Sequence, residues 1–424
     1  MLRRTRPALL ALLLALALGL AACGGNDGSA DSETTQAPAQ TGGMETGEHE
    51  MPSGSDVMSP AADLRVALDS LLGEHAMLAI FATQKGYAGD KDFEAIAKTL
   101  DENSVELSEA IGSVYGAEAA DEFLDGRLLW RDHIGFFVDY TVGLATKDKA
   151  KQRMAVDRLK AYNARSAAFL ASATGLPNKA LLDGVAEHIS QLKGQIDAYA
   201  KGNYDTAYDL VREAYGHMYM TGDALAGAIA AQSPDMFPLE PATQSAADLR
   251  VTLDRLLGEH AILAMVATQK GLDGDADFET IAAALDANSV EVAEAIGSVY
   301  GEAAGKQFLD GPNMWRDHIG FFVDYTVGLA KKDKAAQDKA VGDLKGYIET
   351  SSNFLARATD LPQAALREAI TGHVMDLKGQ IDAYAAGDYE RAYSLFRRAY
   401  EHMIMTGDTL AGAIVMQNPD MFSE

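Results

Sequence analysis

The chain has 424 residues, a length that allows two to three domains, and 48% of its residues are hydrophobic, which is enough to build packed cores. Lys and Arg total 36 against 62 Asp and Glu, for a formal net charge of -26, so nucleic-acid binding is not expected because phosphate recognition needs a basic surface. One cysteine excludes a disulfide framework, a zinc finger and a protein-ligated iron–sulfur cluster. A transition-metal site would therefore rely on His, carboxylate, Met or Tyr ligands.

Residues 1–22 have the features of a bacterial lipoprotein signal peptide. Three arginines precede an Ala/Leu run, residues 8–18, that is too short to span a bilayer comfortably. The sequence Leu20-Ala21-Ala22-Cys23 then resembles a lipobox. We expect Cys23 to be lipidated, with the protein exported and anchored by lipid at the outer face of the cytoplasmic membrane. Residues 23–59 are rich in Gly, Ser, Thr, Asp, Glu and Pro and predict a flexible linker.

The remainder of the chain is a tandem duplication. Residues 61–237 align with residues 246–422 at a constant offset of 185 and without a gap, and about two-thirds of the aligned residues are identical. Each copy is long enough to have its own core, so we predict two domains, 60–237 and 246–424, joined by a linker at 238–245. These domains are called repeat 1 and repeat 2 below.

Each repeat is predicted to be an all-α antiparallel bundle of about six helices. Apolar residues recur at the three- and four-residue spacing of one helix face, proline is nearly absent from the segments, and glycine-containing breaks separate them. In repeat 1 the predicted helices cover residues 64–82, 93–114, 130–144, 159–170, 181–199 and 210–229.

Each of these apolar faces carries a polar residue near its middle. In antiparallel helices the midpoints lie at one level, so we expect these residues to converge on one central layer. Glu106, three residues after Asn103, borders the same layer in this prediction. The predicted metal ligands are His75, His133, His188 and His217 in repeat 1 and His260, His318, His373 and His402 in repeat 2. The predicted cofactor-contacting residues are Asn103, Glu106, Trp130 and Tyr162, with Asn288, Glu291, Trp315 and Tyr347 as their counterparts.

Two explanations of this layer remain open. Several buried histidines without partners would be costly, so they either bind a ligand or form a closed hydrogen-bond network. Neutral imidazole suits copper, zinc, nickel and haem iron, and copper is the first expectation, followed by haem. A hemerythrin-like di-iron centre at His75, Glu106, His133, His188 and His217 is a third hypothesis, although it needs bridging carboxylates and Glu106 is the single good candidate.

The sequence also resembles a known group of proteins. The stretches Leu72-Gly73-Glu74-His75, Leu100-Asp101-Glu102-Asn103-Ser104, Ile111-Gly112-Ser113-Val114-Tyr115-Gly116 and Trp130 to Tyr140 are similar to secreted helical-repeat proteins of Gram-positive bacteria, some of which are named after copper amine oxidases. The resemblance covers both repeats but neither the signal peptide nor the linker. It implies an extracellular location and copper.

Amine oxidase activity itself is not expected. Asn203-Tyr204-Asp205 matches the triplet in which those enzymes convert Tyr to a quinone, but repeat 2 has Asp388-Tyr389-Glu390. Both triplets follow a glycine at a predicted helix start, where Asn and Asp act as N-caps. Other catalytic motifs are absent as well. We therefore predict a non-enzymatic surface protein for metal storage, delivery or sensing. The alternative is a structural or interaction module with a partner protein in the cell envelope.

Overall fold

The structure is a computed structural model that describes residues 56–238 and 244–422. Asp56–Glu424 forms one compact unit, so both repeats belong to the same body. The predicted signal peptide, the lipidation site Cys23 and the predicted linker up to residue 55 lie outside the described residues. Within these residues the structure has helices and no strand, which confirms the predicted all-α class.

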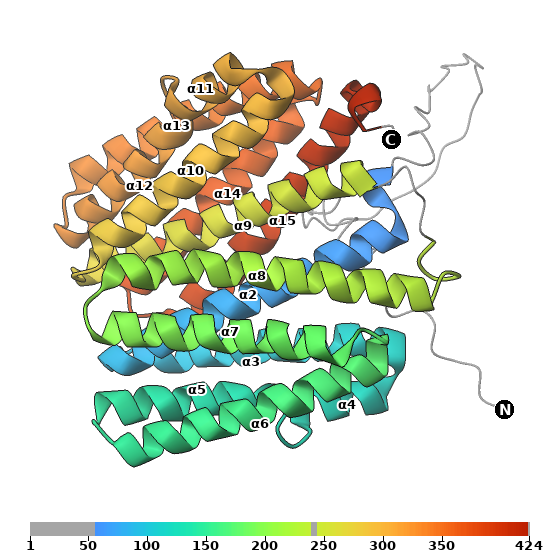
Figure 1. Cartoon of the computed structure of the whole chain (residues 1–424). Coiled ribbons are helices and arrows are strands. Elements are labelled where there is room, and N and C mark those ends of the chain that lie inside the picture. Colours follow the sequence, from blue (N-terminus) through green and yellow to red (C-terminus); the bar gives the residue numbers. More distant parts are fainter. Residues whose placement is uncertain (1–55, 239–243, 423–424) are drawn as a thin grey trace, which may run out of the picture. The chain divides into compact units, whose positions relative to one another are not determined.

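Seven α-helices make up each repeat (Figure 1). In repeat 1 they are α2 (Pro60–Ala88), α3 (Phe93–Tyr115), α4 (Ala117–Asp125), α5 (Trp130–Ala145), α6 (Lys149–Thr174), α7 (Asn178–Ala200) and α8 (Tyr204–Gln232). In repeat 2 they are α9 (Gln244–Asp273), α10 (Phe278–Tyr300), α11 (Glu302–Asp310), α12 (Trp315–Ala330), α13 (Lys334–Thr359), α14 (Gln363–Ala385) and α15 (Tyr389–Gln417). Short 3-10 helices, η1 (Asp56–Met58) and η3 (Pro419–Met421), stand at the two ends.

The helices absent from the sequence prediction are α4 and α11. Each has nine residues, and in α4 the buried residues are Ala120 and Phe123. Such a segment is too short to show a helical period against its surroundings.

Local sequence explains why α2 begins and ends where it does. The side chain of Ser59 accepts a hydrogen bond from the Ala62 backbone N–H at 3.2 Å, and Pro60 occupies the first turn, where its missing N–H costs nothing. Gly89 ends the helix in the left-handed conformation with φ 76°. A side chain is disfavoured there because Cβ would crowd the backbone.

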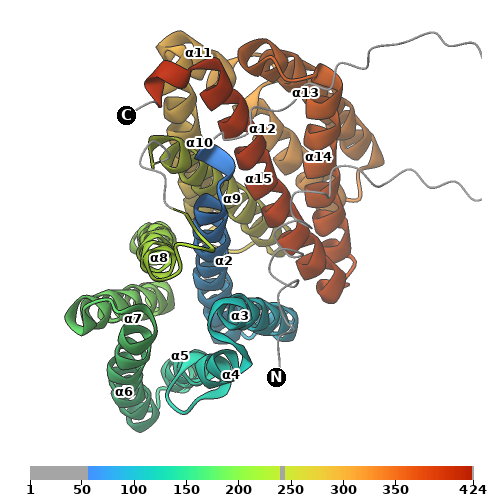
Figure 2. The same ribbon diagram turned by 90° about the vertical axis from the view of Figure 1, so that its right-hand side faces the viewer.

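Helix α2 lies at the centre of repeat 1, and α9 holds the same place in repeat 2. Every residue from Leu72 to Lys85 is buried, on all sides of the helix. Helix α2 contacts α3, α5, α7 and α8 within its repeat and α9 of the other, and Figure 2 shows it between α3, α8 and α9. Among the described residues it is the one helix long and apolar enough to cross a membrane, but 83% of its apolar window is buried in the structure. Its apolar composition is therefore accounted for by central packing.

The two repeats pack against each other through equivalent contacts. Arg397 of α15 binds Glu74 of α2, and Arg212 of α8 binds Glu259 of α9 in the same way. The offset of 185 that relates the repeats also relates these two pairs. The contact between repeats therefore has the reciprocal character of a two-fold symmetric dimer, within one chain.

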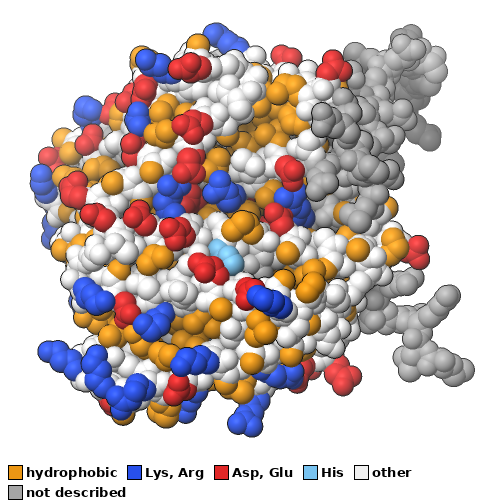
Figure 3. Space-filling model, viewed as in Figure 1, with side chains coloured by type: hydrophobic (Ala, Val, Ile, Leu, Met, Phe, Trp, Pro, Cys, Tyr) orange, Lys and Arg blue, Asp and Glu red, His pale blue; other side chains and the backbone are white. Residues whose placement is uncertain are grey.

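One face of the molecule shows how charged and apolar side chains are distributed. On the face shown in Figure 3, acidic and basic side chains are interspersed, and hydrophobic side chains gather in hollows between the helices.

Candidate metal centres

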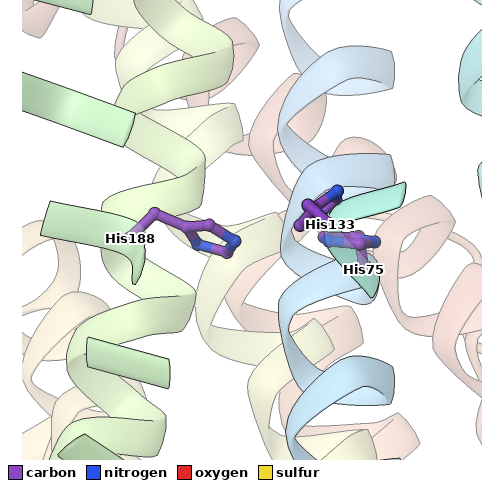
Figure 4. Close-up of side chains that lie close together, drawn as sticks. All are labelled: His75, His133 and His188. Atoms are coloured by element: carbon purple, nitrogen blue, oxygen red, sulfur yellow. The ribbon is translucent and has the colours of Figure 1, made fainter. Parts of the chain in front are cut away.

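Three histidines of repeat 1 meet inside the bundle: His75 of α2, His133 of α5 and His188 of α7 (Figure 4). The candidate ligand atoms, one nitrogen from each ring, all lie within 4.8 Å of one another. The ring centroid of His75 is 5.4 Å from that of His133 and 6.1 Å from that of His188, and the third separation is 6.2 Å. Three different helices thus bring one imidazole each to a common point.

Repeat 2 builds the same cluster from His260, His318 and His373. The corresponding centroid separations are 5.4, 6.0 and 6.2 Å. The convergence predicted for these six histidines is confirmed, and below they are called the two histidine clusters.

The clustered rings are buried and largely without hydrogen-bond partners. His75 and His260 are 0% exposed, and neither nitrogen of either ring has a partner. The same is true of both nitrogens of His373, while His188 has an unpaired Nδ1. An unpaired buried polar group costs on the order of 1–3 kcal/mol. The unpaired nitrogens of each cluster therefore lower the stability of the fold, and a bound ion would remove that loss.

The ring of His133 is oriented by its own helix. Its Nδ1 lies against the backbone carbonyl oxygen of Trp130, one turn earlier. Since a carbonyl can only accept, we assign the ring proton to Nδ1, which leaves the lone pair on Nε2. That Nε2 is buried and has no partner. A metal-binding histidine usually donates its other ring N–H to a carbonyl or carboxylate oxygen, which fixes the orientation of the ring.

Aromatic side chains enclose the cluster. The Trp130 ring centroid is 4.4 Å from that of His75, and its Nε1 donates to Ser104 Oγ at 3.1 Å. Tyr162 stacks on His133 with centroids 4.5 Å apart. Trp315 and Tyr347 repeat these contacts with His260 and His318. The predicted aromatic residues thus contact the imidazoles and exclude water from them.

Burial keeps the clustered histidines neutral. It lowers the pKa of His133 to about 4, and that of His188, His318 and His373 to about 3. The pKa values of His75 and His260 are lowered well below 6.5 by burial and by the neighbouring rings. All six rings therefore carry free lone pairs at neutral pH, as metal coordination requires.

The predicted fourth histidine of each repeat is not part of the cluster. His217 Nε2 lies 2.9 Å from the carbonyl oxygen of Gly184, and the ring is only partly buried. His402 is also partly buried, with Nδ1 3.9 Å from the Asp376 carboxylate. Each ring takes its polar contacts from α7 or α14 and stands outside the group of three.

The predicted amides and carboxylates also lie outside the clusters. Asn103 donates to Glu74 Oε2 at 2.7 Å and to the Leu71 carbonyl oxygen at 3.0 Å. Glu106 pairs with Arg397 at 2.6 Å. Asn288 and Glu291 make the equivalent contacts with Glu259 and Arg212. Because neither cluster includes a carboxylate, the donor set does not fit a bridged di-iron centre.

Sequence reasoning missed the polar residues that join the repeats. The Lys85 ammonium is buried and lies 3.0 Å from Asp92 and 2.8 Å from the Tyr384 hydroxyl of repeat 2. Lys270 makes the equivalent contacts with Asp277 and Tyr199. A lysine inside an otherwise apolar helix, identical in both repeats, was the signal that could have revealed them.

The geometry of the clusters suits a single ion. Nitrogen ligands about 2.0–2.1 Å from a metal lie roughly 3.3–3.6 Å apart, so small inward rotations of the rings would complete the site. The cavities lined by clustered histidines measure about 100 Å³ beside His188, about 70 Å³ beside His373 and about 260 Å³ beside His318. Pockets for drug-sized ligands begin near 300 Å³, and haem is larger than such ligands. The space therefore favours an ion over haem.

Comparison of the chain with protein-family models, with curated proteins and with solved structures found no match.

Proposed function

We propose that this chain is a metal-binding protein with two equivalent sites, each holding one transition-metal ion on three imidazoles. The observation that carries the proposal is the convergence of three buried rings, each with at least one nitrogen that lacks a hydrogen-bond partner, found in both repeats. A structural hydrogen-bond network would pair these nitrogens with one another or with nearby side chains. No hydrogen bond joins the clustered rings in the described part of the chain, which favours metal binding.

Copper is the metal we propose first. Imidazole suits both copper and zinc, and three ligands are enough for Cu(I). Three neutral ligands in a buried site leave the whole charge of the ion uncompensated, which costs more for a divalent than for a monovalent ion. Zinc takes a fourth ligand besides three imidazoles, and neither cluster includes a carboxylate to supply it, so that position would fall to water.

The cellular setting belongs to the same proposal. The lipobox-like sequence ending at Cys23 supports export and lipid anchoring at the outer face of the cytoplasmic membrane. Two buried sites without an acid, base or nucleophile at the ion suit storage, delivery or sensing of metal rather than catalysis.

The two tryptophans provide a direct test, because the chain has only Trp130 and Trp315 and each contacts one cluster. We expect copper to bind at two ions per chain and to quench the fluorescence of both indoles. Metal analysis after gel filtration checks the number of ions. Weak binding that does not survive gel filtration, or uptake that leaves the indole fluorescence unchanged, would contradict the proposal.

Removing one cluster should halve the capacity. His188→Leu is expected to lower the number of tightly bound ions from two to one, and adding His373→Leu should remove the second. His217→Leu is the matched control, since His217 lies on the same bundle but outside the cluster, and it should retain both ions.

The metal-free variants separate metal binding from a structural network. Replacing an unpaired buried polar group by an apolar one of similar size is close to neutral for stability. His188→Leu should therefore change the free energy of unfolding by less than about 1 kcal/mol in the absence of metal. A loss of about 1–3 kcal/mol would show that the ring belongs to a hydrogen-bond network instead.

A further inference from the structure

A cavity stands beside the histidine cluster in each repeat, at equivalent positions. In repeat 1 its lining comes from helices α2 to α8, and includes Leu68, Phe123 and Ile229. In repeat 2 the residues 185 positions later, Leu253, Phe308 and Ile414, line the second cavity. The two repeats differ at about a third of their residues, yet both keep the space open.

The cavity adjoins the cluster directly. His188 belongs to the cluster and also lines the cavity, together with Trp130 and Tyr162, which pack on the other two imidazoles. His373 has the same double position in repeat 2. A molecule in the cavity would therefore lie against an imidazole of the metal site.

The polar side chains of the cavity wall leave a ligand no hydrogen-bond partner beyond the His188 imidazole, which the proposed function assigns to the metal. The Thr174 hydroxyl donates to the Leu170 carbonyl oxygen at 2.7 Å, and the Thr221 hydroxyl donates to that of His217 at 2.9 Å. Among the described lining residues of repeat 1, the buried side-chain atom without a partner is His188 Nδ1. The remainder of the wall consists mainly of aliphatic and aromatic carbon.

We propose that each cavity binds a small, neutral, mostly apolar molecule of about the size of benzene, held against the imidazole of His188 or His373. An apolar cavity of about 150 Å³ takes up benzene, so about 100 Å³ suits a ligand of this size or slightly smaller. The equivalent cavity of repeat 2, with about 70 Å³, should bind it more weakly; the hollow of about 260 Å³ beside His318 is a separate space with other lining residues. The inference deepens the proposed function, since the ligand would lie beside the same ion, but occupancy of the cavity does not require the metal.

Benzene is the probe for the experiment, titrated calorimetrically into the full chain with and without copper. We expect saturable binding with a tighter site in repeat 1 and a weaker one in repeat 2. Ala173 lines the cavity of repeat 1 and Ala358 that of repeat 2, so a larger side chain at either position would take up space in the cavity. Ala173→Phe should weaken the tighter site at least tenfold, and the double variant with Ala358→Phe should lose the sites in both equivalent cavities.

Ala168→Phe is the matched control, because Ala168 is an exposed residue of the same helix α6, and it should bind benzene like the unchanged chain. If Ala173→Phe does not fold, Ala173→Leu is the substitution that fills the cavity in its place. Absence of saturable binding, or binding that persists unchanged in the double variant, overturns the cavity proposal. If copper binds and benzene does not, the cavity proposal is overturned and the proposed metal-binding function stands. If benzene binds and copper is not taken up tightly, the cavity proposal stands and the proposed function is overturned.

Discussion

Replacing Arg397 by Ala is expected to lower the free energy of unfolding by about 3–5 kcal/mol, because it leaves a buried carboxylate without its counter-charge. Arg397 Nε and Nη2 donate to the two oxygens of Glu74 at 2.9 and 3.0 Å, and the Glu74 side chain is 2% exposed. Arg397 belongs to repeat 2 and Glu74 to repeat 1. The lost contact therefore also weakens the joint between the repeats.

Urea unfolding followed by circular dichroism measures this effect. Arg131→Ala is the control, since Arg131 makes two exposed ion pairs, with Asp101 and Asp125, and such pairs contribute at most about 1 kcal/mol. Arg212→Ala should reproduce the large loss, because Arg212 holds Glu259 in the same way. If Arg397→Ala lowered the free energy of unfolding no more than Arg131→Ala does, the buried ion pair between the repeats would be contradicted.

The metal-free protein is expected to unfold on mild acidification. The pKa of His133 is about 4 and that of His188 about 3 in the folded chain, against about 6.5 in the unfolded chain. Below pH 6.5 the unfolded chain therefore binds protons that the folded chain does not. Stability is complete above pH 6.5 and falls by about 1.4 kcal/mol per pH unit for each clustered histidine until the folded pKa is reached.

At pH 5 His133, His188, His318 and His373 should each reduce stability by about 2 kcal/mol, and about 8 kcal/mol in total lies within the 5–15 kcal/mol that stabilises a typical protein. The lowered pKa values of His75 and His260 act in the same direction. Burial raises the pKa of Asp69 and Asp254, which take up protons in the folded chain above pH 3.8 and so partly oppose the loss. We expect the melting temperature of the metal-free chain to drop steeply between pH 7 and pH 5. A melting temperature that stayed constant over this range would rule out buried neutral histidines.

Much of the fold could be read from the sequence because the apolar faces of the long helices are regular. The Trp130 to Ala145 helix shows this well: the spacing of Trp130, His133, Phe137 and Tyr140 predicts one inward face, and all four residues are buried. Pairing between repeats was not readable in the same way. Arg212 and Arg397 look like ordinary surface charges of their helices until the other repeat is placed against them.

The sequence predicted three of the four histidines of each site correctly, because helical periodicity shows which face of a helix points into the bundle. A mid-helix polar residue on an apolar face is placed inside the bundle, which was correct for His75, His133 and His188. Periodicity gives the face of a helix but neither its exact rotation nor its stagger. His217 therefore shares the apolar face of α8 and still takes its polar contact from the Gly184 carbonyl oxygen, outside the cluster.

X-ray absorption spectroscopy of the copper-loaded chain tests the central claim most directly, because it reports the ligands of the bound ion itself. The account predicts two equivalent ions per chain, each with three imidazole nitrogens at about 2.0 Å and no protein carboxylate in the first shell. The same spectrum should lose half its intensity per chain in His188→Leu while its shape remains unchanged. A first shell of carboxylate oxygen or sulfur, or a signal that His188→Leu and His373→Leu together leave intact, would contradict it.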